Sequence, residues 1–258
     1  KTAYEIRNCD WSSDVCSSDL ALRETVVAGV EFKDDLGIDP AQLWRYMRNR
    51  SEAAGATWSE GVVTDLRHTP VVRTADATRD HPCDVVVVAT GAWTPALTRG
   101  LAYDLPIRAA KGYSVTVQGI AELPTRPMLL MDQRTAINPL GDRLRLSTRF
   151  ELTSPDDRKV IAHRVAAILD RAREALHIPA QVAVTDPWTG VRPASADGAP
   201  FIGPLPNRAG RPTVLVAAGH GMIGTSLAAG TADLISRYVF EEEISQAELA
   251  LSPRRISR

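Results

Sequence analysis

The sequence predicts a mixed α/β and α+β fold, in which a domain with parallel strands is interrupted by an antiparallel block. Two apolar, β-branched runs, Cys83–Ala89 and Thr213–Ala218, are typical of strands buried on both faces of a parallel sheet. Between them, Arg143–Arg149 alternates apolar and charged side chains, as half-exposed antiparallel strands do. This order favours a nucleotide-binding domain into which a substrate-covering domain is inserted.

The composition excludes several classes of protein. With 44% apolar and 24% charged residues among 258, the chain is expected to form one large globular domain or two small ones. Its net charge of −1 provides no basic face, so a nucleic-acid partner is not expected. The longest apolar run, Val85–Ala89, is far shorter than the roughly 20 residues of a membrane span, so no transmembrane segment is expected.

The three cysteines, Cys9, Cys16 and Cys83, are too few for a disulfide scaffold and lack metal-ligand spacing. We therefore expect no metal site and a reducing compartment. The predicted location is cytoplasmic, and peripheral association with the inner membrane stays open.

The first twenty residues differ from the rest of the chain. They lack the pattern of a secretory signal, and Asp10–Leu20 (DWSSDVCSSDL) resembles the translation of a common sequencing adapter. We expect Lys1–Leu20, which includes Cys9 and Cys16, to be an artefact and an upstream part of the protein to be missing. A disordered leader rich in Ser and Asp is the alternative.

Local signals place helices and further strands along the chain. Asp39 as N-cap, with Pro40 at the first helical position, begins a helix that Gly55 ends. Ser154 begins another helix, which is expected to run to about His177. Further strands are expected at Ala28–Phe32, Trp58–Arg67, Pro70–Thr74, Ile107–Val117 and Met128–Met131.

One motif, Gly219-His220-Gly221-Met222-Ile223-Gly224, is a literal G-x-G-x-x-G between a strand and a helix that is expected to run to about Phe240. A dinucleotide fingerprint also needs a following strand with an acid about 20 residues on, and here Glu241–Glu243 are followed by no strand. We therefore reject a pyrophosphate site. The glycines and the helix N-terminus still predict close approach to an electron-rich ligand edge. A tight strand–helix corner without a ligand is the alternative.

A second motif, Trp188–Pro204, is dense in turn-forming residues. Arg192 lies in it between Gly190 and Pro193, where a fixed guanidinium can present a two-pronged donor to a carboxylate. A surface or ion-pair arginine is the alternative.

Taken in order, these segments resemble the D-amino-acid oxidase superfamily of FAD enzymes, above all its bacterial D-amino-acid dehydrogenase branch, with glycine and sarcosine oxidases as relatives. The resemblance runs from about Ala28 to Glu241 and rests on the ordered set of motifs. The matching pieces are Asp39–Leu43, Val85–Thr94, Lys111–Val115, Gly141–Leu146, Trp188–Gly203 and Ala217–Gly224.

The resemblance implies a two-domain fold, with FAD between a partial Rossmann-like domain and an antiparallel-sheet substrate domain. The FAD-binding segments would be 21–106 and 187–240, and the substrate domain 107–186. The charged tail 241–258 is expected to fray. The family's own N-terminal βαβ unit, which grips the FAD pyrophosphate, is absent from this sequence, in line with the expected missing segment.

The resemblance also implies non-covalent FAD, because sarcosine oxidases attach flavin through a cysteine near the arginine block and no cysteine follows Cys83. Val63 would lie near the adenine, and Ala89–Trp93 would pass near the pyrophosphate. The loop Gly219–Gly224 would place a helix N-terminus under the flavin pyrimidine edge, where it stabilises the reduced anion. The implied cofactor residues are Val63, Ala89, Thr90, Gly91, Trp93, Gly190, Gly219, Gly221, Met222, Ile223 and Gly224.

For catalysis, the resemblance implies that Arg192 pairs with the substrate carboxylate while the α-hydrogen of a neutral amine passes as hydride to flavin N5. The imine would be hydrolysed to a 2-oxo acid and ammonia. His220 is a candidate base, or a turn histidine whose backbone matters more than its ring. Tyr113 lines the substrate pocket, or is a core or sheet tyrosine.

The expected substrate is an amino acid, first of all a D-amino acid, with glycine, sarcosine or another secondary amine as alternatives. The electron acceptor, oxygen or a quinone chain, stays open. Two other interpretations are a non-catalytic flavoenzyme-like subunit and an inert fragment. Retention of Arg192, Gly219, Gly221 and Gly224 favours the enzyme.

Overall fold

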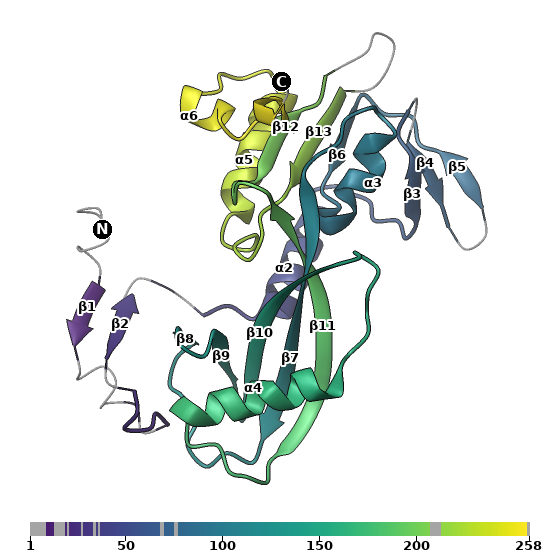
Figure 1. The fold of residues 1–258 in the computed structure, drawn as a ribbon. Helices are drawn as coiled ribbons and strands as arrows, with labels where there is room; N and C mark the ends of the chain where they lie inside the picture. Colours follow the sequence, from purple (N-terminus) through teal and green to yellow (C-terminus); the bar gives the residue numbers. More distant parts are fainter. Residues whose placement is uncertain are drawn as a thin grey trace. The chain divides into compact units, whose positions relative to one another are not determined.

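The computed structural model describes residues 9–12, 19, 21–26, 28–32, 35, 37–67, 70–74, 77–206 and 213–256. The chain divides into two compact units, and Figure 1 colours it by sequence. The domain boundaries expected from the sequence stay a prediction. Unit 1 comprises Lys1–Met47, Gly112–Phe150 and Arg158–Gly190, and unit 2 comprises Arg48–Lys111, Glu151–Asp157 and Val191–Arg258.

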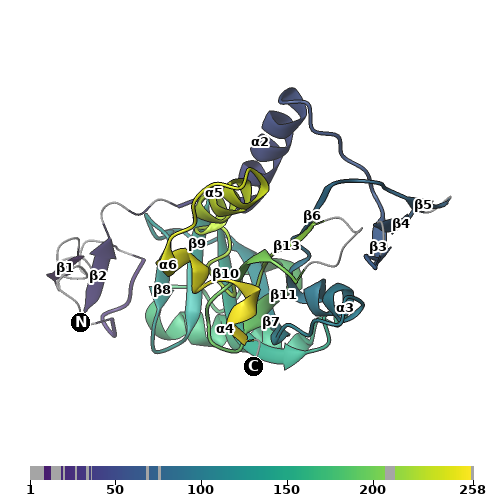
Figure 2. The ribbon, with the colours of Figure 1, turned by 90° about the horizontal axis from the view of Figure 1, so that it is seen from above.

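A five-stranded sheet has the strand order β11-β7-β10-β9-β8, with antiparallel pairing of β8, β9 and β10. Gly141 turns β9 into β10 with a φ of +64°, a left-handed conformation that favours glycine. Helix α4 (Ala162–Ala175) lies on one face of this sheet (Figures 1 and 2). The strands are β7 (Ile107–Gln118), β8 (Met128–Leu130), β9 (Thr135–Leu140), β10 (Arg143–Thr153) and β11 (Ala183–Ser195).

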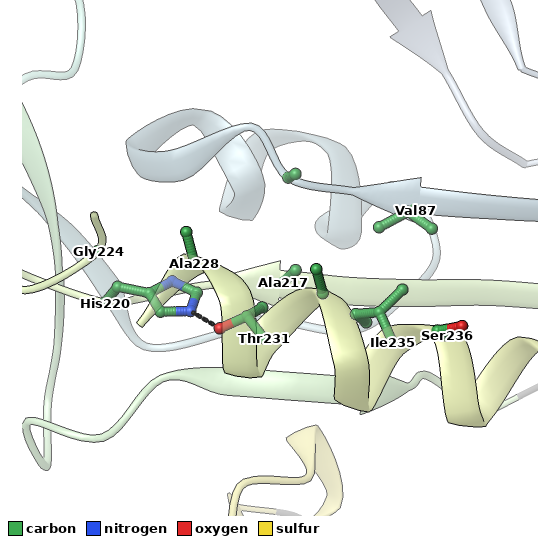
Figure 3. Close-up of a pocket in the computed structure, with 10 residues that line it drawn as sticks. Val87, Ala217, His220, Gly224, Ala228, Thr231, Ile235 and Ser236 are labelled. Atoms are coloured by element: carbon green, nitrogen blue, oxygen red, sulfur yellow. Dashed lines mark hydrogen bonds between the residues drawn. The ribbon is translucent and has the colours of Figure 1, made fainter. Parts of the chain in front are cut away.

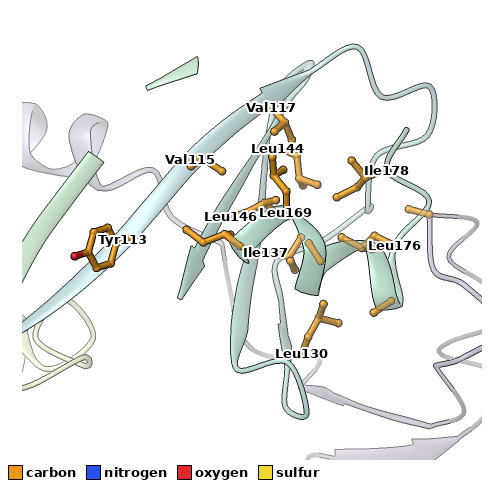
Figure 4. Packing of buried hydrophobic residues seen from close by; sticks show 14 residues of the cluster. Tyr113, Val115, Val117, Leu130, Ile137, Leu144, Leu146, Leu169, Leu176 and Ile178 are labelled. Carbon is orange, nitrogen blue, oxygen red and sulfur yellow. The ribbon is translucent and has the colours of Figure 1, made fainter. Parts of the chain in front are cut away.

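The hydrophobic core of unit 1 lies between α4 and this sheet (Figure 4). Alternate residues of β7 and β10 enter it, because successive side chains of a strand face opposite sides. Burying each large aliphatic side chain stabilises the fold by about 1.5–3 kcal/mol. The cluster includes Tyr113, Val115, Val117, Ile137, Leu144, Leu146, Ile168, Leu169 and Ala172.

Unit 2 contains a three-stranded sheet in the order β12-β13-β6. Strands β6 (Val85–Val88) and β13 (Thr213–Ala218) pair in parallel, and β12 (Phe201–Pro204) joins β13 antiparallel. Helix α5 (Ala228–Val239) contacts β12 and β13. The two apolar runs therefore form the parallel pair that the sequence predicts, and the mixed fold class is confirmed.

Two short helices, η1 (Gly91–Trp93) and α3 (Thr94–Arg99), follow β6 directly. A second small sheet of unit 2 is an antiparallel meander of three strands. The sequence predicts its first two strands but not the third, since no residue of β5 is buried. The meander strands are β3 (Val62–Asp65), β4 (Val71–Arg73) and β5 (Thr78–Asp80).

The first predicted helix is confirmed as α2 (Pro40–Ala53). Asp39 caps it, because its carboxylate accepts a hydrogen bond from the Ala41 amide at 2.9 Å, and these backbone bonds lower the pKa of Asp39. Gly55 follows with a φ of +95°.

Near the start of the chain, the expected strand at Ala28–Phe32 is confirmed as β2 (Gly29–Phe32), which pairs with β1 (Cys9–Ser12). Cys16 and most of the adapter-like stretch lie outside the described residues, so the prediction for residues 1–20 stays a prediction.

The helix expected to begin at Ser154 begins instead at Ala162. A turn precedes it, closed by a bond from the Asp157 amide to the Ser154 carbonyl. The Asp157 carboxylate accepts a hydrogen bond from Thr153 at 3.0 Å and pairs with the buried Lys111 ammonium at 2.8 Å. These partners favour the turn over an earlier helix start.

The expectation that the tail Glu241–Arg258 frays is wrong within the part that the structure describes. Ser245 and Glu248 form a capping box, in which each side chain accepts from the other's backbone N–H. The Arg255 guanidinium donates to both carboxylate oxygens of Asp197, at 2.8 and 3.1 Å. The tail forms α6 (Gln246–Leu249) and η2 (Pro253–Ile256).

Candidate functional site

The loop Gly219–Gly224 follows β13 and carries the G-x-G-x-x-G pattern. Gly219 and Gly221 have φ angles of +88° and +58°, in the left-handed region that favours glycine. A Cβ atom on Gly221 would meet no atom within 4 Å. The backbone at Gly221 is therefore open to close approach by a ligand, as the sequence predicts.

The helix after this loop begins later than expected. Its first residue is Ala228, with Leu227 as N-cap, and turns occupy most of the residues between Gly221 and Leu227. The left-handed Gly221 interrupts helical geometry, and the Leu227 side chain makes no capping bond. The expectation that the helix starts directly after Gly224 is therefore wrong.

The two sequence motifs meet in unit 2. The Gly221 amide donates to the Pro193 carbonyl at 2.9 Å, and His220 forms an isolated antiparallel bridge with Ala194. The glycine loop is thereby fixed to the strand segment that carries Arg192. Although the two motifs lie far apart in the sequence, the fold brings their backbones into contact.

Arg192 lies on β11, one residue before Pro193. Its side chain is half-buried, and burial lowers the pKa of its guanidinium. An arginine nevertheless stays protonated in proteins. Arg192 therefore brings a cation with paired donors, the group that binds a carboxylate best, to the segment next to the glycine loop.

The ring of His220 contacts helix α5. Its Nε2 lies 3.0 Å from the Thr231 hydroxyl (Figure 3), and the side chain is half-buried. Burial lowers the pKa of His220, which favours the neutral imidazole at neutral pH. This anchored ring fits the turn-histidine alternative, and a role as base stays a prediction.

A pocket of about 490 Å³ opens beside His220. Figure 3 shows side chains of α5, β6 and β13 around it. Its wall consists mostly of alanine, valine and isoleucine side chains, with His220, Thr231 and Ser236 as the polar groups. The lining residues are Val87, Ala89, Ala217, His220, Gly224, Ala228, Thr231, Ala232, Ile235 and Ser236.

The residues predicted near the pyrophosphate lie at the carboxyl end of β6. Ala89 lines the same pocket as His220 and Gly224. Gly91 has a φ of +56°, and a Cβ on it would meet no atom within 4 Å. The Trp93 indole N–H donates to the Asp156 carboxylate at 2.9 Å, which fixes the ring.

Thr90 and Val63 complete the predicted cofactor residues of unit 2. The Thr90 hydroxyl lies 3.1 Å from that of Thr94, at the start of α3. Val63, on β3, packs against the hydrophobic cluster of unit 2. A nucleotide-binding role for these two residues stays a prediction.

A family profile described as FAD dependent oxidoreductase (DAO) matches residues 11–238. The chain belongs to the DAO family. Membership confirms the family and the FAD cofactor that the sequence resemblance implies.

Curated relatives of this DAO-family chain include D-amino acid dehydrogenases. The chain is 30% identical over 245 residues to the enzyme of Sinorhizobium medicae, which covers 90% of this chain and 56% of that relative. It thus spans little more than half the length of that relative. An oxidoreductase of Halorhodospira halophila, described as uncharacterized, is 32% identical over 207 residues, which cover 78% of this chain and 86% of the relative.

Solved structures of similar fold include the glycine oxidase of Geobacillus kaustophilus, with a TM-score of 0.82 and 27% identity. That match covers 96% of this chain and 67% of the other. The iminodiacetate oxidase of Chelativorans sp. BNC1 has a TM-score of 0.80 at 20% identity over 97% of this chain and 68% of that one, which shows a shared fold.

The residues of unit 2 fit the FAD of the DAO family. Gly91 and Gly221 present open backbone that a phosphate or a flavin edge can approach. The Ser195 hydroxyl oxygen is buried and has no hydrogen-bond partner within the described part of the chain. Ser195 lies against Gly219, since a Cβ on that glycine would come within 3.4 Å of it. A bound polar group would satisfy this hydroxyl.

Two predicted site residues belong to unit 1. Tyr113 is 1% exposed and lies in the core cluster, at one end of it, with its hydroxyl pointing away from the other labelled side chains (Figure 4). This position fits the core alternative, and a pocket role for Tyr113 stays a prediction. Gly190 is required locally, because a Cβ on it would overlap the indole of Trp188.

Two polar residues of unit 2 are not predicted from the sequence. Thr231 lies on α5 eleven positions after His220 and bonds its ring, and Ser195 carries the unpartnered hydroxyl. Thr231 belongs to no recognisable motif, and Ser195 lies within the Trp188–Pro204 motif without a residue type that marks it, so only the folded backbone reveals their roles. The described part of the chain has no helix with the length and apolar character of a bilayer span, and no metal-binding cluster of His, Cys, Asp or Glu.

Proposed function

We propose that this chain belongs to an enzyme that oxidatively deaminates an amino acid, with a D-amino acid as the substrate. One observation carries the proposal: the hydrogen bond from the Gly221 amide to the Pro193 carbonyl, which joins the open glycine loop to the arginine strand. The sequence identity of 30% to a D-amino acid dehydrogenase supports the choice of substrate.

In this function, Arg192 binds the substrate carboxylate through two parallel N–H donors, which fixes both the distance and the rotation of the substrate. Bound FAD supplies a hydride acceptor for the substrate α-carbon, and water converts the imine to a 2-oxo acid and ammonia. Neutral His220 holds the loop through Thr231 and is available to take up a proton at its ring.

FAD is proposed to bind without a covalent link. Cys83, the cysteine nearest the predicted cofactor residues, lies before β6 and is exposed. Backbone N–H groups of the loops that carry Gly91 and Gly221 would hold the cofactor, with Val63 at the adenine. Met222 and Ile223, largely exposed in the second loop, would cover the flavin.

A second candidate function is oxidation of glycine or sarcosine. The structural likeness to a glycine oxidase at 27% identity favours it. Both candidate functions are compatible with oxygen or with a quinone as the electron acceptor. A cytoplasmic location with peripheral contact to the inner membrane is proposed for the quinone case.

The test is anaerobic mixing of the FAD-loaded protein with single substrates, followed by the visible flavin absorbance. D-amino acids should bleach the flavin faster than their L-enantiomers, glycine or sarcosine. If glycine or sarcosine reduces the flavin and D-amino acids do not, the second candidate function is favoured. A flavin spectrum that no amine alters would contradict both and favour the non-catalytic subunit or the inert fragment.

A further inference from the structure

Arg145 lies on the face of the five-stranded sheet that α4 does not cover. Its neighbours on β10, Leu144 and Leu146, enter the core beneath α4. Because side chains alternate along a strand, Arg145 points to the opposite face. Its hydrogen bonds and its ring contact lie within unit 1.

Two buried hydroxyls hold the Arg145 guanidinium in place. Its Nη2 donates to Ser114 Oγ at 2.7 Å and its Nη1 to Thr116 Oγ1 at 3.2 Å. Both hydroxyls are neutral, so they orient the guanidinium without balancing its charge. Across the described residues, no carboxylate lies within ion-pair distance of Arg145, whereas Arg143 on the same strand pairs with Asp142.

Trp188 on β11 flanks this cation. The Arg145 Cζ lies 6.0 Å from the centroid of the indole, and the tryptophan is 55% exposed. Gly190 permits this arrangement, since a side chain there would overlap the indole. The exposed ring surface is therefore held beside a fixed guanidinium, and it offers apolar area to a carbon chain.

Asn138 adds a second polar group to the same face. It stands directly opposite Arg145 in the β9–β10 pair, and directly opposed residues share a face of the sheet. Its amide has no hydrogen bond to any residue that the structure describes. The Arg145 guanidinium, however, reaches the other way, over β7 to Ser114 and Thr116, so the cation and the aromatic ring come together while Asn138 lies on the far side of β10.

We propose that Arg145 and Trp188 form a subsite that binds the carboxylate of a small organic acid. Two N–H groups of Arg145 are used by Ser114 and Thr116, and the others remain to grip a carboxylate. The indole selects an acid with a carbon chain over an inorganic anion. Neither Arg145 nor Trp188 is among the predicted cofactor residues, so the subsite does not rest on the proposed function.

The experiment titrates glutarate into the full chain and follows heat and tryptophan fluorescence. Glutarate should bind saturably, whereas glutaramide, its neutral diamide, and inorganic phosphate should bind at least about tenfold more weakly. Absence of saturable glutarate binding overturns the proposal. So does glutaramide or phosphate that binds as tightly as glutarate. Because no flavin or turnover is needed, failure here is separate from failure of the proposed function.

Variants locate the binding. Arg145→Gln should weaken glutarate binding at least about tenfold, while the matched control Arg143→Gln, on the same strand and exposed, should change it less than about twofold. Trp188→Leu should weaken binding and remove the fluorescence change. If Arg145→Gln does not fold by circular dichroism, Trp188→Leu decides: unchanged glutarate affinity in this variant overturns the subsite. Equal loss of affinity in the two arginine variants also overturns it.

Discussion

Arg192 carries substrate recognition in the proposed reaction, because a carboxylate is the feature that all α-amino acids share. Arg192→Lys keeps the charge but loses the two-pronged donor, so it should raise KM and lower kcat. Arg192→Ala should lower kcat/KM by an amount equivalent to about 2–5 kcal/mol. Steady-state kinetics with a D-amino acid measures both effects.

Two controls separate substrate binding by Arg192 from a structural role. Flavin content should stay near that of the wild type in both variants. A decarboxylated amine should be a poor substrate of the wild type, and its kcat/KM should fall little further in the variants. If Arg192→Ala keeps kcat/KM within about twofold, the carboxylate is bound elsewhere and the amino-acid assignment weakens.

Gly221 combines a left-handed backbone with open space, so its substitutions separate backbone strain from ligand contact. Gly221→Val introduces strain of about 1–3 kcal/mol and fills the open space with a branched side chain. Gly221→Asn fills part of the same space, but asparagine tolerates the left-handed region. Both variants should bind FAD more weakly by visible absorbance, while thermal unfolding should show a large stability loss for valine alone. Native FAD affinity in both would refute ligand contact at this loop.

His220 gives stability a defined pH dependence. Burial lowers its pKa, so below the ordinary histidine value of about 6.5 the unfolded chain binds more protons than the folded chain. The stability that neutral His220 contributes is fully present above that pH and is lost as the pH falls through it. Urea unfolding from about pH 8 to about pH 5.5 should show the wild type losing stability relative to His220→Gln, which cannot titrate. Parallel pH curves for the two proteins would contradict this assignment.

At the scale of elements, the tail depends on its capping box. Ser245 caps α6, and Arg237 and Ser245 together lower the pKa of Glu248 to about 2. Ser245→Ala should lower the free energy of unfolding by about 1 kcal/mol, the usual effect of losing an N-cap. Denaturant titration measures it, with Gln246→Ala, at an exposed position of the same helix, as the comparison. If Ser245→Ala lowers the free energy of unfolding by less than the comparison variant does, α6 adds nothing to stability.

Sequence periodicity predicts the helices and strands that bury one or both faces. It fails where bonds between side chains decide where an element begins or whether a segment is ordered. The valine run of β6 and the alternation of β10 identify their strands, because burial on both faces or on one leaves a distinct pattern. The start of α4 is decided by Asp157, whose bonds to Thr153 and Lys111 come from beyond the local pattern. The order of the tail likewise depends on Arg255 reaching Asp197 across 58 positions.

In the candidate site, too, some residues can be predicted from the sequence and others cannot. The glycine positions and Arg192 are visible in the sequence because turns and paired donors require particular residue types. Ser195 and Thr231 are not, since a hydroxyl gains its role from the neighbour that folding gives it. Tyr113 illustrates the reverse case: an aromatic residue within the Lys111–Val115 motif packs in the core of unit 1.

At the scale of the whole molecule, the assignment of FAD to unit 2 predicts where the cofactor stabilises the chain. A ligand that binds only the folded state suppresses local opening at its contacts. Hydrogen exchange with FAD added should therefore slow at residues 85–94 and 217–236, which contain the two open loops and the pocket. The buried elements β9 and α4 should exchange as before, and Gly221→Val should abolish the protection at both loops. Slower exchange confined to β9 and α4, with both loops unaffected, would place the cofactor outside these loops and refute the proposed FAD residues.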